Sequence, residues 1–385
     1  MNKKYILYLL KTYLPLFVIT FFILALPLIV DLSTCKLTYY PDSQPFYASR
    51  SPFISGSYTA LVGIASVMAS AYPLFVESYR FSKKNADFSY PLPFKNNSHR
   101  LHRSLCFILV FLSIFSLAYW LPLSIYYIRV NNVVLEEGEA LREVASSLML
   151  FVSYLYILPF LFAQFYISTF FVRLGNNWVS SILLTIAGNI LLMLSIPSIG
   201  IWIQCIIGPS DSVAISFYEF LFFSTYGPSQ LVISYLLLFS NAINYGKFGA
   251  FSMNSTFVAI IIGLIVEITL GVLSFIFLYK VKDPSGEYSG SKGAYKKGGI
   301  YILMAAMILI SFLLGTVIGN FADWTMIIVF TNIFTIFISV GFYISFLLFE
   351  KTPKLSSKAW ICFAIAVSSL IIFALISSVI RTAIH

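Results

Sequence analysis

Long apolar runs separated by short polar segments recur along the whole chain. Runs such as Thr256–Tyr279 and Ile300–Gly319 hold about 20 nearly uncharged residues each, which as helix span the ~30 Å hydrocarbon core of a bilayer. Strands of a membrane barrel would instead show alternating segments of about ten residues. The pattern predicts an all-α polytopic membrane protein with about nine transmembrane helices, near residues 12–30, 59–78, 104–127, 148–171, 178–203, 256–279, 300–319, 324–348 and 359–380.

One further apolar segment, Ser212–Ser240, is interrupted in its middle by Tyr226-Gly227-Pro228-Ser229, and Gly with Pro usually ends a helix. Cytoplasmic loops carry an excess of Lys and Arg. If the segment 212–240 is a re-entrant hairpin on the outer face, 18 of the 24 Lys and Arg residues lie inside, whereas a full crossing gives 12 on each side. The hairpin is therefore expected, with the N-terminus in the cytoplasm and the C-terminus outside.

Composition supports the membrane assignment. Hydrophobic residues make up 59% of the chain and charged residues 10%, whereas soluble domains carry about 25% charged residues. The apolar run Thr12–Val30 is long and lacks a small-x-small cleavage pattern, so it is expected to be an uncleaved first helix. Abundant Ile, Phe, Tyr, Lys and Asn indicate a low-GC bacterial genome, and hence the plasma membrane.

The predicted cytoplasmic loop between the second and third helices, residues 80–103, carries six Lys or Arg and two His. Such a loop can simply bind anionic lipid headgroups. The order of its residues also permits a docking surface for a cytoplasmic partner: Asp87 can cap a short helix, Tyr90–Pro93 breaks it, and Lys95–Arg103 can form a second amphipathic piece leading into the third helix.

The run Ala86-Asp87-Phe88, then Pro91-Leu92-Pro93-Phe94-Lys95, followed by a basic amphipathic stretch and a helix, resembles permeases of the ABC-2 type transporter superfamily. The interrupted hairpin resembles the re-entrant pair of such permeases. The segment Lys280–Gly290, with Ser-x-Glu-x-x-Gly, resembles a loop after helix six in a branch that has additional helices. Asn96-Asn97 departs from the family, which often has a basic residue there.

The resemblance implies a division into a six-helix permease core (1–279) with a coupling loop (80–103) and the hairpin (212–240), a basic linker (280–299) and three additional helices (300–385). It also implies a cytoplasmic P-loop ATPase partner and a second permease subunit, identical or homologous. ATP and Mg²⁺ would bind the ATPase, and no cofactor is expected on this chain. The residues implied at the ATPase contact are Asp87, Leu92, Pro93, Lys95 and Arg100.

Few polar residues fall at membrane depth, where ionisable groups are costly and usually face a bundle interior or cavity. Glu267 can line or gate a substrate path, or it can be a protonated or hydrogen-bonded glutamate that holds helices together. Glu219, Gly227 and Pro228 belong to the hairpin and are candidates for the translocation path or its gate, and Glu219 can alternatively have a structural role there. Gln164 and Asn189 are expected to hydrogen-bond between helices.

Several chemistries lack their motifs. No Gly-x-x-x-x-Gly-Lys-Ser/Thr, Gly-x-Ser-x-Gly or His-Glu-x-x-His occurs, and the four cysteines have no paired spacing. We therefore expect a non-enzymatic exporter subunit for a hydrophobic or amphipathic substrate, such as an antimicrobial peptide or lipid, in contact with membrane lipids and not with nucleic acid. The alternatives are a membrane enzyme for lipid-linked substrates, which the short outer loops 31–58 and 128–147 without His disfavour, an ion-driven transporter, and a non-transporting immunity or sensor protein.

Overall fold

The computed structural model of this chain describes a set of long helices. It describes residues 3–34, 37–38, 47–48, 57–81, 98–131, 147–175, 178–207, 228, 231–232, 235, 255–280, 294–319, 324–350, 354 and 356–384. Nine long helices lie in these ranges: α1 (Lys3–Thr34), α2 (Ser57–Val76), α4 (Ser98–Asn131), α5 (Ser147–Leu174), α6 (Trp178–Ile207), α10 (Ser255–Lys280), α11 (Ala294–Gly319), α12 (Trp324–Glu350) and α13 (Ser357–Ile384). A short 3₁₀ helix, η1 (Ser78–Phe81), follows α2.

Eight of these helices contain a stretch long and apolar enough to cross a membrane, and α10 contains a shorter apolar stretch, Ile260–Ile276. Many large apolar side chains face outward, as lipid requires; Phe22 and Ile336, for example, are more than half exposed. The prediction of a multi-pass, all-helical membrane protein with about nine helices is therefore confirmed. The one exception among the described residues is a two-residue antiparallel pair, β1 (Leu37–Thr38) with β2 (Tyr47–Ala48), in the first loop.

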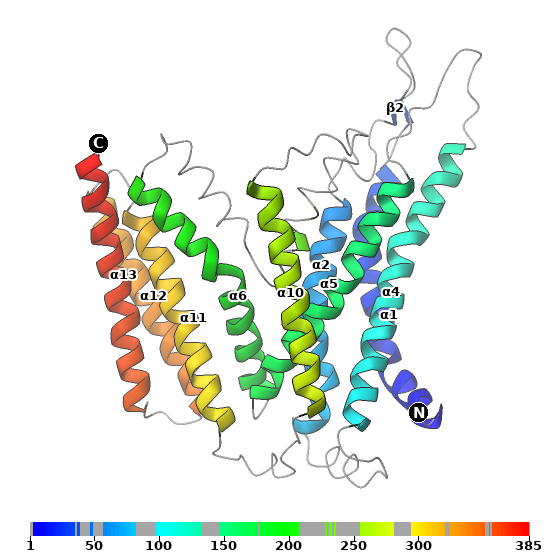
Figure 1. Ribbon diagram of the computed structural model, residues 1–385, viewed down its shortest axis with the longest axis horizontal. Helices are drawn as coiled ribbons and strands as arrows, with labels where there is room; N and C mark the ends of the chain where they lie inside the picture. The colour runs from blue at the N-terminus through cyan, green and yellow to red at the C-terminus, as the bar shows by residue number, and fades with distance from the viewer. Residues whose placement is uncertain are drawn as a thin grey trace.

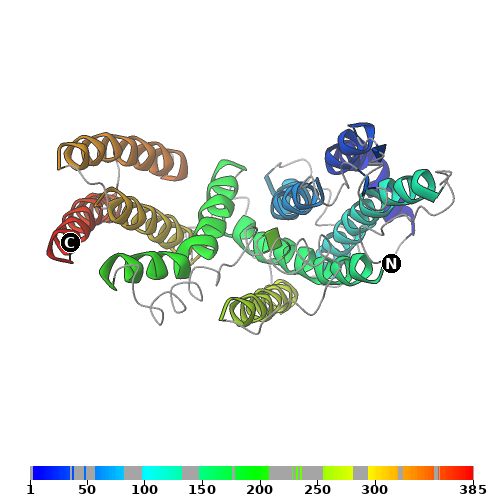
Figure 2. The same ribbon diagram turned by 90° about the horizontal axis from the view of Figure 1, so that it is seen from above.

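The helices fall into two groups, each held together by its own buried apolar side chains. One core is built from α1, α2, α4 and α5, with Leu231, Tyr235 and the α10 residues Leu264 and Phe275 packed against it. Two smaller cores join the last helices: one includes Leu184 of α6 with α11, α12 and α13, and the other lies among α11–α13. Seen from above, α6 lies between the two groups (Figure 2). The predicted boundary at 280–299 stays a prediction.

Helix directions bear on the segment 212–240. Helix α6 ends, and α10 begins, at the same end of the molecule, and the two chain termini lie at opposite ends (Figure 1). The contacts of α10 agree, because Gly271 lies against Ala163 and Phe275 against Tyr166, so α10 runs parallel to α5. The helices on either side of the segment 212–240 thus end and begin at the same end of the molecule, while the re-entrant hairpin stays a prediction. The course of the hairpin itself lies outside the described residues, apart from 228, 231, 232 and 235.

Prolines occur inside five of the helices, at positions 15, 27, 73, 122, 159 and 197. Membrane helices tolerate proline because neighbouring groups can satisfy the carbonyl that loses its donor. Helix α6, which contains Pro197, is visibly bent (Figure 1), and proline is a usual cause of such bends.

Two glycines provide a test of the packing in the second group. A Cβ at Gly315 of α11 would lie 2.5 Å from the carbonyl oxygen of Leu370 in α13, whereas a Cβ at Gly341 of α12 would meet nothing within 4 Å. We expect Gly315→Leu to lower the free energy of unfolding by about 1–3 kcal/mol through overpacking, and Gly341→Leu to leave it unchanged. Thermal unfolding of the two purified variants in detergent measures this; equal losses would contradict the packing.

Candidate functional site

The predicted coupling loop is bounded by described structure on both sides. Asp87, Leu92, Pro93 and Lys95 lie outside the described residues, and Arg100 lies in the first turn of α4. Before the loop come the end of α2 and η1; after it comes the start of α4. The described residues at the two ends of the loop, its first and second flanks, show how it is attached to the helices.

The helix after the loop begins earlier than the predicted position near residue 104. The sequence allows an amphipathic piece, Lys95–Arg103, that leads into this helix. In the structure α4 begins at Ser98 and continues without interruption to Asn131, so residues 98–103 are part of the helix itself. The reason is local: no Gly or Pro occurs from Ser98 to Leu121, so nothing ends the helix between its basic first turns and its apolar body.

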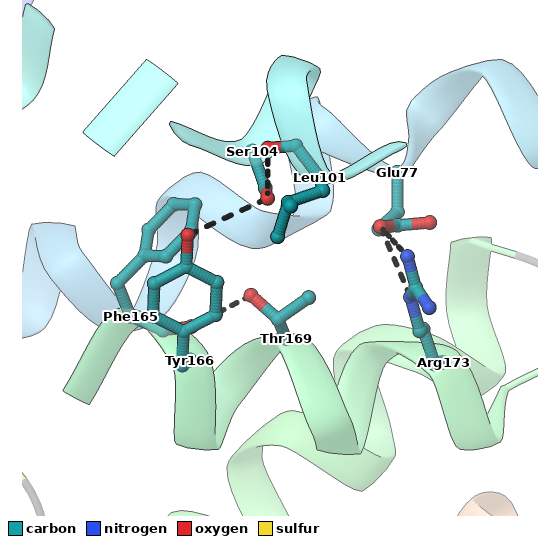
Figure 3. A network of polar contacts seen from close by, with 7 residues as sticks. All are labelled: Glu77, Leu101, Ser104, Phe165, Tyr166, Thr169 and Arg173. Carbon is teal, nitrogen blue, oxygen red and sulfur yellow. Dashed lines mark hydrogen bonds and ion pairs between the residues drawn. The ribbon is translucent and has the colours of Figure 1, made fainter. Parts of the chain in front are cut away.

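An ion pair joins the first flank to α5. Glu77 directly follows the last residue of α2, and its backbone N–H still donates to the carbonyl of Pro73 (2.9 Å). Both Nε and Nη2 of Arg173, in the last turn of α5, donate to Oε1 of Glu77 at 3.1 Å (Figure 3). The side chain of Glu77 is 2% exposed and that of Arg173 is 11% exposed. Removing one member of a buried pair leaves an uncompensated charge and typically costs about 3–5 kcal/mol.

A second set of polar contacts joins both flanks to α1. The guanidinium of Arg103 in α4 is buried; its Nη2 donates to the hydroxyl of Tyr13 at 2.8 Å, and it lies 5.6 Å from the centre of the Tyr13 ring. The Tyr13 hydroxyl is also 3.3 Å from Oγ of Ser78, the first residue of η1. Tyr13 therefore links Ser78, just before the loop 80–103, to Arg103, the last residue of the loop.

Helix α5 likewise reaches both flanks. Besides the ion pair of Arg173 with Glu77, the hydroxyl of Tyr166 lies 3.5 Å from Oγ of Ser104 in α4 (Figure 3). On the first flank, the ring of Phe81 also packs on Trp178 at the start of α6, with ring centres 5.3 Å apart. We term the polar contacts among these residues the loop brace: Tyr13, Glu77, Ser78, Arg103, Ser104, Tyr166 and Arg173.

Sequence reasoning missed the loop brace. From the sequence, Arg173 is counted only among the Lys and Arg residues expected on the cytoplasmic side, and Glu77 is not among the candidate residues. A signal was present, because Glu77 is an acid directly after an apolar run and before a loop in which basic residues predominate. The partner could not be read, since Glu77 and Arg173 are 96 positions apart.

A second polar cluster lies at membrane depth between α2, α5 and α6. Gln164 of α5 is fully buried, and its Nε2 lies within hydrogen-bond distance of Ser70 Oγ (2.6 Å) in α2 and Asn189 Oδ1 (2.7 Å) in α6. Asn189 also donates to the Thr185 carbonyl of its own helix at 2.8 Å. The prediction that Gln164 and Asn189 hydrogen-bond between helices is confirmed.

Glu267 lies near the middle of α10 and is fully buried. One turn further along, Gly271 brings α10 very close to α5: a Cβ there would be 2.5 Å from the Cα of Ala163. The burial of Glu267 fits both expected roles, in a path or as a contact between helices. Among the described residues, no group of three or more His, Cys, Asp or Glu is placed to hold a metal ion.

Of the hairpin candidates, only Pro228 is described; Glu219 and Gly227 lie outside the described residues. Oγ of Ser66, midway along α2, donates to the carbonyl of Pro228 at 3.0 Å. Leu231 and Tyr235 are buried in the first core. These described residues of the segment therefore pack against the first group of helices, as membrane-embedded irregular backbone would need.

The chain was compared with protein-family models, with curated proteins and with solved structures, and none of them matches it.

The Gln164 cluster yields a stability prediction. Gln164→Leu leaves the buried groups of Ser70 and Asn189 without the amide, and we expect it to lower the free energy of unfolding by about 1–3 kcal/mol. The matched control is Asn332→Leu, since Asn332 is exposed on α12 and donates to the Ile328 carbonyl of its own helix. Thermal unfolding in detergent distinguishes them; an undiminished midpoint for Gln164→Leu would show that the cluster adds no stability.

Proposed function

We propose that this chain is the transmembrane permease subunit of an ATP-driven exporter of the ABC-2 type. The observation that carries the proposal is the loop brace: the segment whose sequence resembles a coupling element is held at both flanks by polar contacts to α1 and α5. A loop that only binds lipid headgroups needs no such attachment. A loop that receives force from a partner does need it, because force is passed on only through contacts that persist when the loop is displaced.

In this proposal the energy comes from a separate cytoplasmic P-loop ATPase that binds Asp87, Leu92, Pro93, Lys95 and Arg100. ATP and Mg²⁺ belong to that partner. The chain works with a second permease subunit, identical or homologous, and moves a hydrophobic or amphipathic molecule such as an antimicrobial peptide or lipid. Glu267 and the hairpin residues Glu219, Gly227 and Pro228 border the path or its gate.

The proposed location is a bacterial plasma membrane, with the N-terminus in the cytoplasm and the C-terminus outside. The distribution of Lys and Arg supports this orientation, because it places residues 80–103 and 280–299 on the cytoplasmic side. The brace then lies at the cytoplasmic ends of α1, α2, α4 and α5, where an ATPase could act on it.

The alternatives are a membrane enzyme acting on lipid-linked substrates and a non-transporting immunity or sensor protein. An enzyme needs converging acid, base or nucleophilic groups. The buried polar groups of the described segments are mainly hydroxyls, many of which bond to the preceding turn of their own helix, and the buried carboxylate Glu77 is paired with Arg173, which does not favour a reaction centre in these segments.

The partner is tested by purification from native membranes. We expect the wild-type chain to recover a P-loop ATPase, and the double variant Leu92→Ala/Pro93→Ala to recover much less, since it changes the proposed contact and keeps Arg103 in the brace. Lys354→Ala, at an exposed charge between α12 and α13, is the control and should behave as wild type. Recovery of no ATPase with the wild type would favour the enzyme or sensor alternatives.

Glu267→Gln tests the role of the carboxyl group. Glutamine keeps the size and hydrogen-bonding capacity of a protonated glutamate but cannot ionise. If Glu267 takes part in transport, the variant should retain its thermal stability but lose the resistance that the chain and its ATPase confer against a panel of membrane-active peptides. Full resistance with the variant would limit Glu267 to holding helices together.

A further inference from the structure

Helices α1 and α5 each contact residues at both ends of the coupling loop (80–103). Tyr13 of α1 reaches Ser78 before the loop and Arg103 after it. From α5, Arg173 reaches Glu77 before the loop and Tyr166 reaches Ser104 after it. Two separate helices therefore hold the same two flanks, so the flanks cannot move apart or rotate without breaking buried polar contacts.

Among the contacts of the loop brace, the pair of Glu77 with Arg173 joins two opposite charges. Two N–H groups of one guanidinium meet a single carboxylate oxygen at 3.1 Å, in a place where both side chains are nearly excluded from solvent. Charge-assisted hydrogen bonds are stronger than neutral ones, and burial reduces their screening by water and salt. The 3.5 Å contact of Tyr166 with Ser104 is a much weaker attachment.

Helix α5 continues from this pair to the membrane-embedded contacts. Gln164 lies nine residues before Arg173, or about 14 Å along a helix, and it hydrogen-bonds to both α2 and α6. Ala163, its neighbour, is in close backbone contact with Gly271 of α10. A displacement of α5 at Arg173 is therefore passed to α6 by hydrogen bonds and to α10 by steric contact.

We propose that Glu77 and Arg173 are a positioning pair that transmits the nucleotide state of the bound ATPase from the coupling loop to α5. This inference deepens the proposed function and rests on it. Neither residue touches ATP or the transported molecule. The pair fixes the end of α2, and with it the start of the loop, to the end of α5, so that the two move together.

The test measures movement in the complete complex with its ATPase, in lipid nanodiscs. Spin labels are placed at Leu155→Cys, exposed on α5, and Val379→Cys, exposed on α13, in a background whose native cysteines are replaced. Pulsed electron paramagnetic resonance spectroscopy then gives the distance between the two labels, first without nucleotide and then after trapping with Mg-ATP and vanadate. With Glu77 and Arg173 both present, the distance between the two labels should differ between the nucleotide-free and the trapped state.

In Glu77→Gln we expect the ATPase to remain bound, because no residue of the proposed docking contact changes, and the nucleotide-dependent shift to be lost. Glu77→Asp, which keeps the charge, and the exchange Glu77→Arg/Arg173→Glu, which reverses the pair, should each restore it at least in part. Lys354→Gln removes an exposed charge outside the brace and should leave the shift intact. A merely structural pair would lower thermal stability without abolishing the shift in the molecules that remain folded.

Three results would overturn the inference. A wild-type shift in Glu77→Gln would show that the pair does not transmit. Loss of the ATPase from a Glu77→Gln chain of wild-type stability would place Glu77 in docking. If the wild-type chain itself recovers no ATPase, the proposed function fails before any variant is compared, and the transmitting role fails with it, whereas failure of the pair alone leaves ATPase recovery by the wild type intact.

Discussion

Every peptide group inside hydrocarbon must find its hydrogen-bond partner within the protein, because no water is present to replace one. This constraint accounts for the nine long helices, since an α-helix satisfies its own backbone. It also explains why hydroxyls within the spans bond to the preceding turn of their own helix, as Thr20 does to the Leu16 carbonyl and Ser116 to the Leu112 carbonyl. Tyrosine hydroxyls, amides and charged groups then connect one helix to another, as Tyr72 of α2 does by donating to Thr20 Oγ1 of α1 at 2.6 Å.

These connecting side chains are concentrated on α5. Along one helix, Gln164 joins α2 and α6, Tyr166 meets α4, and Arg173 pairs with Glu77 beyond the end of α2. Polar groups in lipid are costly and therefore face the interior of a bundle, which fits the position of α5 at the centre of its group (Figure 2). A helix so connected cannot shift alone. Its neighbours must follow, or several buried bonds must break together.

The fold could be predicted from sequence because run length and charge act locally: about 20 apolar residues specify a span wherever they occur. The link between Gln164 and Asn189 was also foreseeable, since each is an isolated amide at membrane depth with few other partners. The start of α4 was predicted six residues too late because the apolar run begins near residue 104, whereas the helix includes the basic residues before it and no residue there ends a helix. The pair of Glu77 with Arg173 was not foreseeable, because it depends on how α2 and α5 are placed beside each other, which no local pattern encodes.

Helix α6 contacts both groups of helices. Its residues Leu184 and Ala187 belong to a core shared with α11–α13. On its other side, only residues 175–177 separate it from α5 along the chain, and Asn189 accepts a hydrogen bond from Gln164 of α5. At that turn, Oγ of Ser181 donates to the carbonyl of Val172 at 2.9 Å, which fixes the start of α6 to the end of α5. A displacement of α5 must therefore carry the first half of α6 with it. The second half contains Pro197, where a helix bends at low cost because one backbone hydrogen bond is already missing. The half of α6 before Pro197 thus contacts both groups of helices, since Ser181 and Asn189 bond to α5 while Leu184 and Ala187 pack in the core shared with α11–α13; a displacement of α5 therefore reaches the last three helices through this half.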